Sequence, residues 1–351
     1  MGRPVALVAE EALVDEVLHA AAVVGCELER VADVDALRGR WSGAPAVVLD
    51  EGAALACAAA GLPRRPGVLV VGTGPPGEAT WRCALELGAE QVVRLPDGRG
   101  GLRAALADAV EGPVDGGRVL AVLGARGGAG ASVLAVAVGR AVLAAGGHAL
   151  LVDCDPLGGG LDLTLGAERQ EGLRWPALRL TEGRVPAAAL RSALPGVRRG
   201  DGSLTVLSCG RTGPGPAPEA VVAVVEAGRR AGGTVVCDVP RQLTGAACAA
   251  LDRADLAVLV VPADVKACVA ARGLVEQVAA RGVRLRAVVR GPAPGGLSAA
   301  EVVAAVDVPL LTAMRPEPRL AAALDSGRVP GAGRGPLAKA AREVLEVLGA
   351  C

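Results

Sequence analysis

The chain has 351 residues, of which 52% are hydrophobic and only 1% aromatic, and its 37 basic residues balance 37 acidic ones. At roughly 150 residues per domain this length predicts two domains, and the high apolar content excludes a mostly disordered chain. The neutral total argues against a nucleic-acid coat protein and against an acidic tail.

Short runs rich in Val and Leu alternate with Ala-rich stretches of helical length along the whole chain. This alternation is typical of helices packed on parallel sheets. The first series of candidate strands comprises Val5–Val8, Cys26–Val31, Ala46–Leu49, Val68–Val71 and Gln91–Leu95. The second series comprises Val119–Leu123, Ala149–Val152, Leu204–Leu207, Thr234–Cys237, Ala257–Val261 and Leu285–Val289. We therefore expect an α/β protein with a receiver-like (flavodoxin-like) domain at 1–112, a linker at 113–117 and a larger doubly wound parallel sheet at 118–351.

Charge divides at the same point of the chain. Residues 1–115 carry 17 acidic and 10 basic residues, and residues 116–351 carry 20 acidic and 27 basic ones. Opposite signs favour docking of the halves on each other or on differently charged partners, and two ordinary solvated surfaces are the alternative. Residues 266–351 hold 12 basic and 7 acidic groups without an interleaved aromatic, so nucleic-acid binding is not expected.

The spacing of charged residues argues against membrane insertion, and the spacing of cysteines argues against disulfide bonds. The longest run without a charged residue, 127–139, is far shorter than the roughly 20 apolar residues that a membrane span needs. The N-terminus turns acidic at Glu10 and Glu11 without a cleavage pattern, which predicts a cytoplasmic protein. Nine scattered cysteines without a C-x-x-C pair predict small buried side chains rather than disulfides or zinc ligands.

The strongest local signal is a Gly-rich turn between an apolar strand and an apolar helix, at residues 118–142. Glycines at 127, 128 and 130 allow backbone N–H groups to converge on phosphate oxygens, and the start of the helix adds its positive dipole end. A hydroxyl at Ser132 stands where it would ligate magnesium. The candidate phosphate-binding residues are Gly124, Arg126, Gly127, Gly128, Ala129, Gly130, Ala131, Ser132 and Val133.

Later motifs make a family resemblance specific. The order GARGGAGAS, LLVDCDP, VVCDVP, ADLAVLVVPADVKACVAARGL and DVPLLTAMRPEPRLAAALDSGRVPG resembles the deviant-Walker-A ATPases of the MinD/ParA family. Within that family the chain is most similar to the CpaE-like or TadZ-like branch, which includes actinobacterial septum site-determining proteins. The resemblance covers residues 118 to about 335, and the receiver-like domain matches this branch too. It implies a P-loop sheet, ATP or ADP with Mg²⁺, a homodimer, and partners in the division or Tad-type pilus and secretion machinery.

The resemblance also implies roles for residues outside the loop. Similar proteins place an acidic pair near magnesium and the attacking water, which here is Asp153 and Asp155, and a Walker B carboxylate, which here is Asp238. Magnesium would then be held by Ser132, Asp153 and Asp238, with Asp155 as the catalytic residue if any hydrolysis occurs. The alternative is that these strand-end Asp residues cap the following helices. Arg290 and Pro292 are expected to border the base, whereas Asp162 is expected to serve structure.

One departure from the family loop affects the expected activity. The loop K-G-G-x-G-K-[ST] of the family has Arg126 and Ala131 at its two lysine positions, and no lysine precedes Lys266. Arg126 keeps a cation, but Ala131 removes the ammonium that would stabilise a transferring phosphoryl group, a loss that commonly costs several kcal/mol. We expect a spatial regulator with little or no ATP hydrolysis, at most a slow ATPase, recruited to the septum or pole. An active ATPase using Arg126 or a partner's cation, and a nucleotide-free interaction scaffold, are the alternatives.

The N-terminal segment resembles a phosphoreceiver that has lost essential groups. Glu10, Glu11, Asp50 and Thr73 stand at receiver positions, but Arg94 and the residues after it replace the receiver lysine. We expect a pseudo-receiver used for dimerisation or partner docking, with Asp50 as a phosphoacceptor left open.

Overall fold

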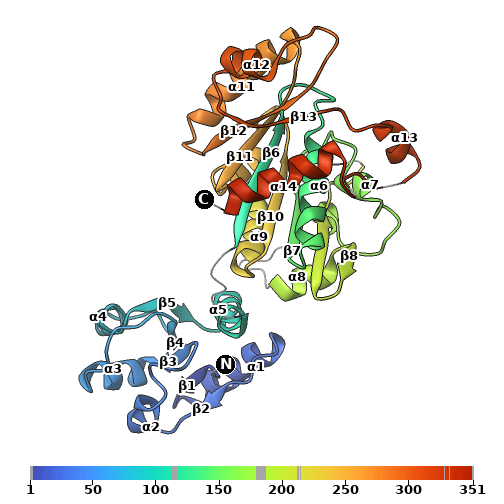
Figure 1. The fold of residues 1–351 in the computed structure, drawn as a ribbon. Coiled ribbons are helices and arrows are strands. Elements are labelled where there is room, and N and C mark those ends of the chain that lie inside the picture. The colour runs from blue at the N-terminus through green and yellow to red at the C-terminus, as the bar shows by residue number, and fades with distance from the viewer. Residues whose placement is uncertain are drawn as a thin grey trace. The chain divides into compact units, whose positions relative to one another are not determined.

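The computed structural model describes residues 3–111, 117–178, 187–211, 213, 215–327, 329–331 and 333–349. These residues fold into two compact units, the first at the N-terminal end of the chain and the second, larger one over the rest (Figure 1). Most of the predicted linker, residues 113–116, lies outside the described residues. None of the helices in the described ranges is both long and apolar enough to cross a lipid bilayer.

The first unit is a parallel sheet of five strands in the order β2-β1-β3-β4-β5. Its strands are β1 (Val5–Leu7), β2 (Glu29–Arg30), β3 (Val47–Asp50), β4 (Val68–Gly72) and β5 (Ala89–Arg94). Its helices are α1 (Glu11–Val23), α2 (Val34–Arg38), α3 (Glu51–Ala59), α4 (Glu78–Leu87) and α5 (Arg99–Glu111). One apolar cluster packs α1 and α5 on one face of the sheet, and a second packs α2, α3 and α4 on the other. This strand order confirms the flavodoxin-like expectation.

The second unit is built on eight strands in the order β13-β12-β11-β6-β10-β7-β9-β8. They are β6 (Arg118–Gly124), β7 (His148–Asp153), β8 (Gly196–Arg199), β9 (Gly202–Leu207), β10 (Thr234–Val239), β11 (Leu256–Pro262), β12 (Leu285–Arg290) and β13 (Leu310–Met314). All neighbours pair in parallel except β8, which is antiparallel to β9. The central strands are continuous apolar runs because helices bury both of their faces.

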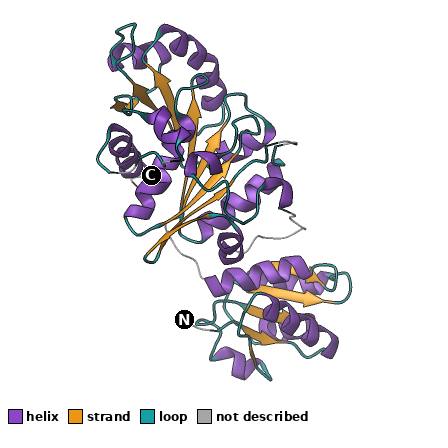
Figure 2. Cartoon of the chain, turned by 90° about the vertical axis from the view of Figure 1, so that its right-hand side faces the viewer, coloured by secondary structure: helices purple, strands orange, loops and turns teal. Residues whose placement is uncertain are grey.

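Helices cover both faces of this larger sheet (Figure 2). They are α6 (Ala131–Ala144), α7 (Leu161–Leu165), α8 (Ala187–Ala193), α9 (Pro218–Arg230), α10 (Gly245–Leu251), α11 (Val265–Ala279), α12 (Ala299–Val306), α13 (Leu320–Asp325) and α14 (Pro336–Gly349), with a 3₁₀ turn at Trp175–Ala177. The core joins α6 and α14 to the sheet through Leu134, Val138, Ala341 and Val344. All eleven predicted strands are present, and the doubly wound P-loop fold is confirmed.

Two strands that the sequence pattern did not predict lie at the edges of the larger sheet. β8 reads GVRR and is largely exposed, and β13 reads LLTAM and is buried only at Met314. Edge strands bury less apolar surface than central ones, so their sequences lack the apolar run by which a buried strand is recognised. The eight described cysteines are free and seven of them are buried, which confirms their predicted packing role.

Candidate nucleotide-binding site

The Gly-rich loop connects β6 to α6 and is built to leave backbone N–H groups exposed. Gly128 and Gly130 have φ angles of 72° and 104°, a left-handed conformation that glycine adopts without strain. The N–H of Ala125 donates to the carbonyl of Val260 in β11 at 3.0 Å, which fixes the loop to the sheet. α6 starts without a side-chain cap and without an acidic residue in its first turn. Its first N–H groups are therefore available to an anion.

Strand register places two of the predicted carboxylates side by side. β7 and β10 pair so that Asp153 lies opposite Asp238, and both side chains are buried. The Ser132 hydroxyl at the start of α6 faces Asp238 and favours its charged form. Burial, with a smaller effect of the charges on Asp153 and Asp155, raises the pKa of Asp238 to about 7, against the lowering effect of Ser132. A buried carboxylate of this kind is stabilised by a cation.

Asp153 is held by hydrogen bonds from several parts of the chain. Its Oδ2 accepts from the N–H groups of Leu161 and Cys209 and from the Ser208 hydroxyl, each at 3.0 Å. Its Oδ1 accepts from the N–H of Asp155 at 3.1 Å. Burial raises the pKa of Asp153 while these bonds lower it. Because Leu161 is the first residue of α7, Asp153 satisfies the start of that helix, as the capping alternative predicted.

The Ser208 oxygen also lies 3.1 Å from Oδ1 of Asp162, so its single proton is shared between Asp153 and Asp162. Asp162 is buried and pairs with Arg211 at 2.9 Å and with Arg174 at 3.4 Å. These ion pairs hold the segments after β7 and β9 together, which supports the expected structural role of Asp162.

Asp155 and Asp238 differ from Asp153 because neither satisfies the start of a helix. Asp155 is partly exposed, and its Oδ1 accepts the N–H of Leu157 at 3.0 Å. α10, the helix after β10, is capped by Thr244 rather than Asp238. Within the described part of the chain, no group of three or more His, Cys, Asp or Glu side chains could hold a metal by itself. A magnesium ion would therefore depend on Ser132, Asp238 and phosphate oxygens together.

A pocket of about 570 Å³ opens beside the Gly-rich loop, within the range of 300–1,000 Å³ that is common for small-ligand sites. It is lined by the loop residues Arg126, Gly130 and Val133 and by Arg290 and Pro292 after β12. The structure thus brings the two expected base-bordering residues together with the loop. Ala131, in contrast, begins α6 and is half-buried against the core.

Three charged residues of this pocket were missed by sequence reasoning: Asp264, Glu317 and Arg319. Asp264 caps α11 through the N–H of Ala267 at 2.8 Å and pairs with Arg126 at 2.9 Å. The pKa of Asp264 is lowered, mainly by its hydrogen bond with Arg126. An Asp between the end of an apolar strand and a helix is a capping signal that could have located Asp264.

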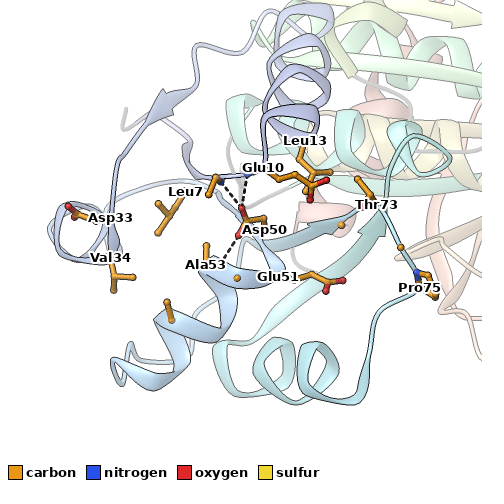
Figure 3. Close-up of a pocket in the computed structure, with 15 residues that line it drawn as sticks. Leu7, Glu10, Leu13, Asp33, Val34, Asp50, Glu51, Ala53, Thr73 and Pro75 are labelled. Atoms are coloured by element: carbon orange, nitrogen blue, oxygen red, sulfur yellow. Dashed lines mark hydrogen bonds between the residues drawn. The ribbon is translucent and has the colours of Figure 1, made fainter.

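The first unit has a pocket of its own, of about 690 Å³, at the carboxyl ends of β1, β3 and β4 (Figure 3). Asp50 lies in it, but its Oδ2 accepts the N–H groups of Ala9 at 2.6 Å and Glu10 at 3.4 Å, and its Oδ1 accepts that of Ala53 at 2.7 Å. Arg94, at the receiver lysine position, pairs with Asp97 and does not line the pocket. These contacts use Asp50 to join the β1–α1 turn to α3.

Sequence comparison identifies relatives over almost the whole chain. The chain is 47% identical over 346 residues to the protein Rv3660c of Mycobacterium tuberculosis strain H37Rv, which covers 97% of each chain, and equally to protein MT3760 of strain CDC 1551. Residues 7–117 match the family model described as Rv3660c-like, CheY-like N-terminal domain. The chain belongs to the Rv3660c-like family.

Solved structures show the fold of the Rv3660c-like chain beyond its CheY-like domain. The ParA family ATPase of Chlorobium tepidum is 16% identical with a TM-score of 0.56, over 66% of this chain and 99% of that one. The MinD cell division protein of Aquifex aeolicus is 22% identical with a TM-score of 0.53, over 65% and 97%. MinD complexed with Mg-ADP from Pyrococcus horikoshii is 17% identical with a TM-score of 0.52, over 67% and 98%. This Rv3660c-like chain therefore combines a CheY-like domain with the MinD/ParA fold.

Proposed function

We propose that the chain is a nucleotide-binding spatial regulator of the MinD/ParA type with little or no ATP hydrolysis. It would act in septum-site determination or in localising Tad-type pilus or secretion assembly. The observation that carries this proposal is the Gly-rich loop with N–H groups at the start of α6 beside Ser132 and Asp238. At the two lysine positions of the family loop this chain has Arg126, which keeps a cation, and Ala131, which does not. The Mg-ADP named for the Pyrococcus horikoshii protein supports the choice of ligand.

The residues present fit a magnesium nucleotide, which is ATP or ADP in this proposal. The loop N–H groups from Gly127 to Ser132 would bind phosphate oxygens, except that of Ala129, which donates to the Arg126 carbonyl at 3.1 Å. Ser132 and Asp238 would hold Mg²⁺, which supplies charge neutralisation there. Asp153, with its oxygens occupied by four donors, would orient this edge of the sheet around the ion. If any hydrolysis occurs, Asp155 would orient the attacking water.

Slow or absent hydrolysis follows from the electrostatics of the loop. Ala131 offers no charge to a transferring phosphoryl group, and Arg126 is already paired with Asp264 at 2.9 Å. Without an ammonium fixed in the loop beside the developing charge, binding is retained while the transition state loses stabilisation. An active ATPase using Arg126 would first have to break this ion pair.

A homodimer is the assembly we propose, joined on the face that carries the site. Val265 and Val269, one turn apart at the start of α11 beside Asp264, are 65% and 68% exposed. Leu157, two residues after Asp155, is 90% exposed. Apolar side chains exposed around a site suit a protein interface. The MinC:MinD complex of Aquifex aeolicus, of similar fold, supports further partner proteins.

Equilibrium dialysis with radiolabelled ATP and ADP, with and without Mg²⁺, tests the proposal directly. We expect binding in the micromolar range and turnover well below that of an active ATPase. Absence of binding would favour the nucleotide-free scaffold. Fast turnover that Asp155→Ala abolishes would favour the active enzyme.

Ala131→Lys separates the two nucleotide-binding alternatives. The new ammonium should strengthen ATP binding or increase turnover if the site lacks a needed cation. The control is Ala144→Lys, which adds the same charge at the exposed end of α6, away from the loop. A change inside the helix such as Gly139→Ala would not serve, because Leu151 and Leu204 fill the space beside Gly139. An unchanged Ala131→Lys protein with intact hydrolysis would support an ATPase that works through Arg126 or a partner.

Localisation of a fluorescent fusion in growing cells tests the spatial part of the proposal. Enrichment at septa or poles, lost in Asp238→Ala, is the expected result. A uniform distribution at all stages of growth would contradict it.

A further inference from the structure

Arg290 lies closer to the Gly-rich loop than a residue that only borders a base would require. It ends β12, and its Nη1 is 3.5 Å from the point that a Cβ on Gly130 would occupy. Gly130 directly precedes Ala131, the position at which the family loop carries its second lysine. A guanidinium thus lies over the part of the loop that lacks the ammonium.

The charge of Arg290 is not neutralised by the protein. Its side chain makes no hydrogen bond or ion pair within the described ranges, and it is half-buried. Burial, and next the charge of Arg126, lower the pKa of Arg290. Two guanidinium groups therefore face one carboxylate, Asp264, which is bonded to Arg126. A partly desolvated cation beside a like charge is unfavourable unless an anion joins it.

The pocket around Arg290 has the same excess of positive charge. Its charged lining residues are Arg126, Arg290 and Arg319 against Asp264 and Glu317. Glu317 accepts the N–H of Leu337 near the start of α14 at 2.9 Å, and among the described residues it forms no ion pair with Arg290. The ligand that fits this pocket is therefore anionic on the side of the loop.

We propose that Arg290 takes the place of the missing loop lysine, by binding the terminal phosphates of a nucleoside di- or triphosphate across Gly130. This inference rests on the proposed function and assigns the phosphate cation to β12 instead of the loop. A guanidinium can bind phosphate through two parallel N–H groups, and its length compensates for its origin on a neighbouring strand. Pro292, two residues after Arg290 along the chain, keeps its expected role of bordering the base.

If Arg290 binds the terminal phosphates, its contribution to affinity should depend on how many phosphates the ligand carries. Arg290→Gln keeps much of the side-chain volume and removes the charge. We expect it to weaken binding of ADP and of inorganic tripolyphosphate by about tenfold or more, as loss of a charge-assisted contact does, and to leave AMP binding nearly unchanged. Isothermal titration calorimetry of the full chain without nucleotide carry-over measures all three ligands.

Two further variants make the result specific. Ala131→Lys in the Arg290→Gln background should restore ADP binding, because it returns a cation to the same phosphates. Arg286→Gln removes a guanidinium from the same strand, outside the pocket, and should bind all three ligands as the wild type does. Equal melting temperatures of the variants confirm that each is folded.

The outcomes separate this inference from the proposed function. Failure of the wild-type chain to bind ADP or ATP would overturn the proposed function and the role of Arg290 together. If the wild type binds, equal weakening of AMP and ADP by Arg290→Gln would assign Arg290 to the base and overturn the inference alone. An unchanged affinity for ADP and tripolyphosphate would overturn it as well.

Discussion

At the scale of single residues, the ion pair between Arg126 and Asp264 controls how much positive charge the nucleotide site offers. Asp264→Asn removes the carboxylate but keeps an Asn that can still cap α11. Freed from its partner at 2.9 Å, Arg126 should bind phosphate, and ADP affinity should rise by about three- to tenfold. Calorimetric titration with ADP measures the change.

Asp252→Asn is the matched control for this variant. Asp252 pairs with Arg281 and does not line the nucleotide pocket, so its replacement should leave ADP affinity as it is. Weaker ADP binding by Asp264→Asn would contradict the argument, because it would show that the carboxylate itself helps to hold the ligand.

Asp238 gives the site a pH dependence with a definite sign. Its pKa is raised from 3.8 to about 7, so the folded chain binds this proton more tightly than the unfolded chain does. Its burial therefore reduces the free energy of unfolding progressively from about pH 4 to about pH 7, and by a constant amount above that. Asp238→Asn should raise the melting temperature at about pH 8 by several degrees more than at about pH 5.

Calorimetry without Mg²⁺ at both pH values checks this expectation. Asp201→Asn, at an exposed turn, should show the same small effect at both. A stabilisation of Asp238→Asn that is equal at the two pH values would show that charge on Asp238 is not its cause.

The residues of the site were predictable from sequence to different degrees. The loop and Asp238 directly follow strong strand patterns, so their places were predicted from the ends of these strands together with the family resemblance. The partnership of Arg126 with Asp264 and the position of Arg290 over Gly130 join residues more than 130 positions apart along the chain. Long side chains on different strands meet through rotamers that no local spacing encodes.

At the scale of secondary-structure elements, prediction succeeded where strands are buried on both faces. β6 and β11 appear in the sequence as unbroken apolar runs. β2 has only two paired residues, Glu29 and Arg30, within the six that were expected. β2, β8 and β13 all lie at sheet edges, where pairing with one neighbour and partial exposure leave a weak pattern.

Asp50 connects elements of the first unit, and its removal should weaken that unit. Asp50→Ala leaves the N–H groups of Ala9 and Ala53 without their acceptor and removes the cap of α3. We expect a loss of about 2 kcal/mol or more in the free energy of unfolding. Urea denaturation followed by circular dichroism measures it.

Glu86→Ala, an exposed change on α4, should cost little under the same conditions. If Asp50→Ala is as stable as the wild type, and the wild type is phosphorylated by acetyl phosphate at Asp50, the pseudo-receiver interpretation is wrong.

At the scale of the whole molecule, the site belongs to one of the two units. The loop, both carboxylates and the pocket lie between residues 118 and 337, and the first unit has an apolar core of its own. A fragment of residues 117–351 should therefore bind ADP within about twofold of the full chain, because it keeps every residue that lines the nucleotide pocket. Titration of fragment and full chain side by side tests this.

A large loss of affinity in a folded fragment would show that the acidic first unit contributes to binding. Residues 1–115 and 116–351 carry opposite net charges, so an electrostatic effect of the first unit on binding is the alternative that this experiment tests. The sequence predicted a receiver-like part and a P-loop part from two series of strands, separated by a stretch with Pro and paired Gly residues just before a new strong strand.

The pairing of Asp153 with Asp238 on neighbouring strands also limits how sequences of this family can diverge. Side chains alternate between the two faces of a strand, so insertion or deletion of one residue between Thr234 and Asp238 would turn the carboxylate away from Ser132. Length changes are therefore compatible with the site only in the connections between strands. The number of residues from the start of β10 to Asp238 therefore indicates an intact site better than the identity of the apolar residues between them does.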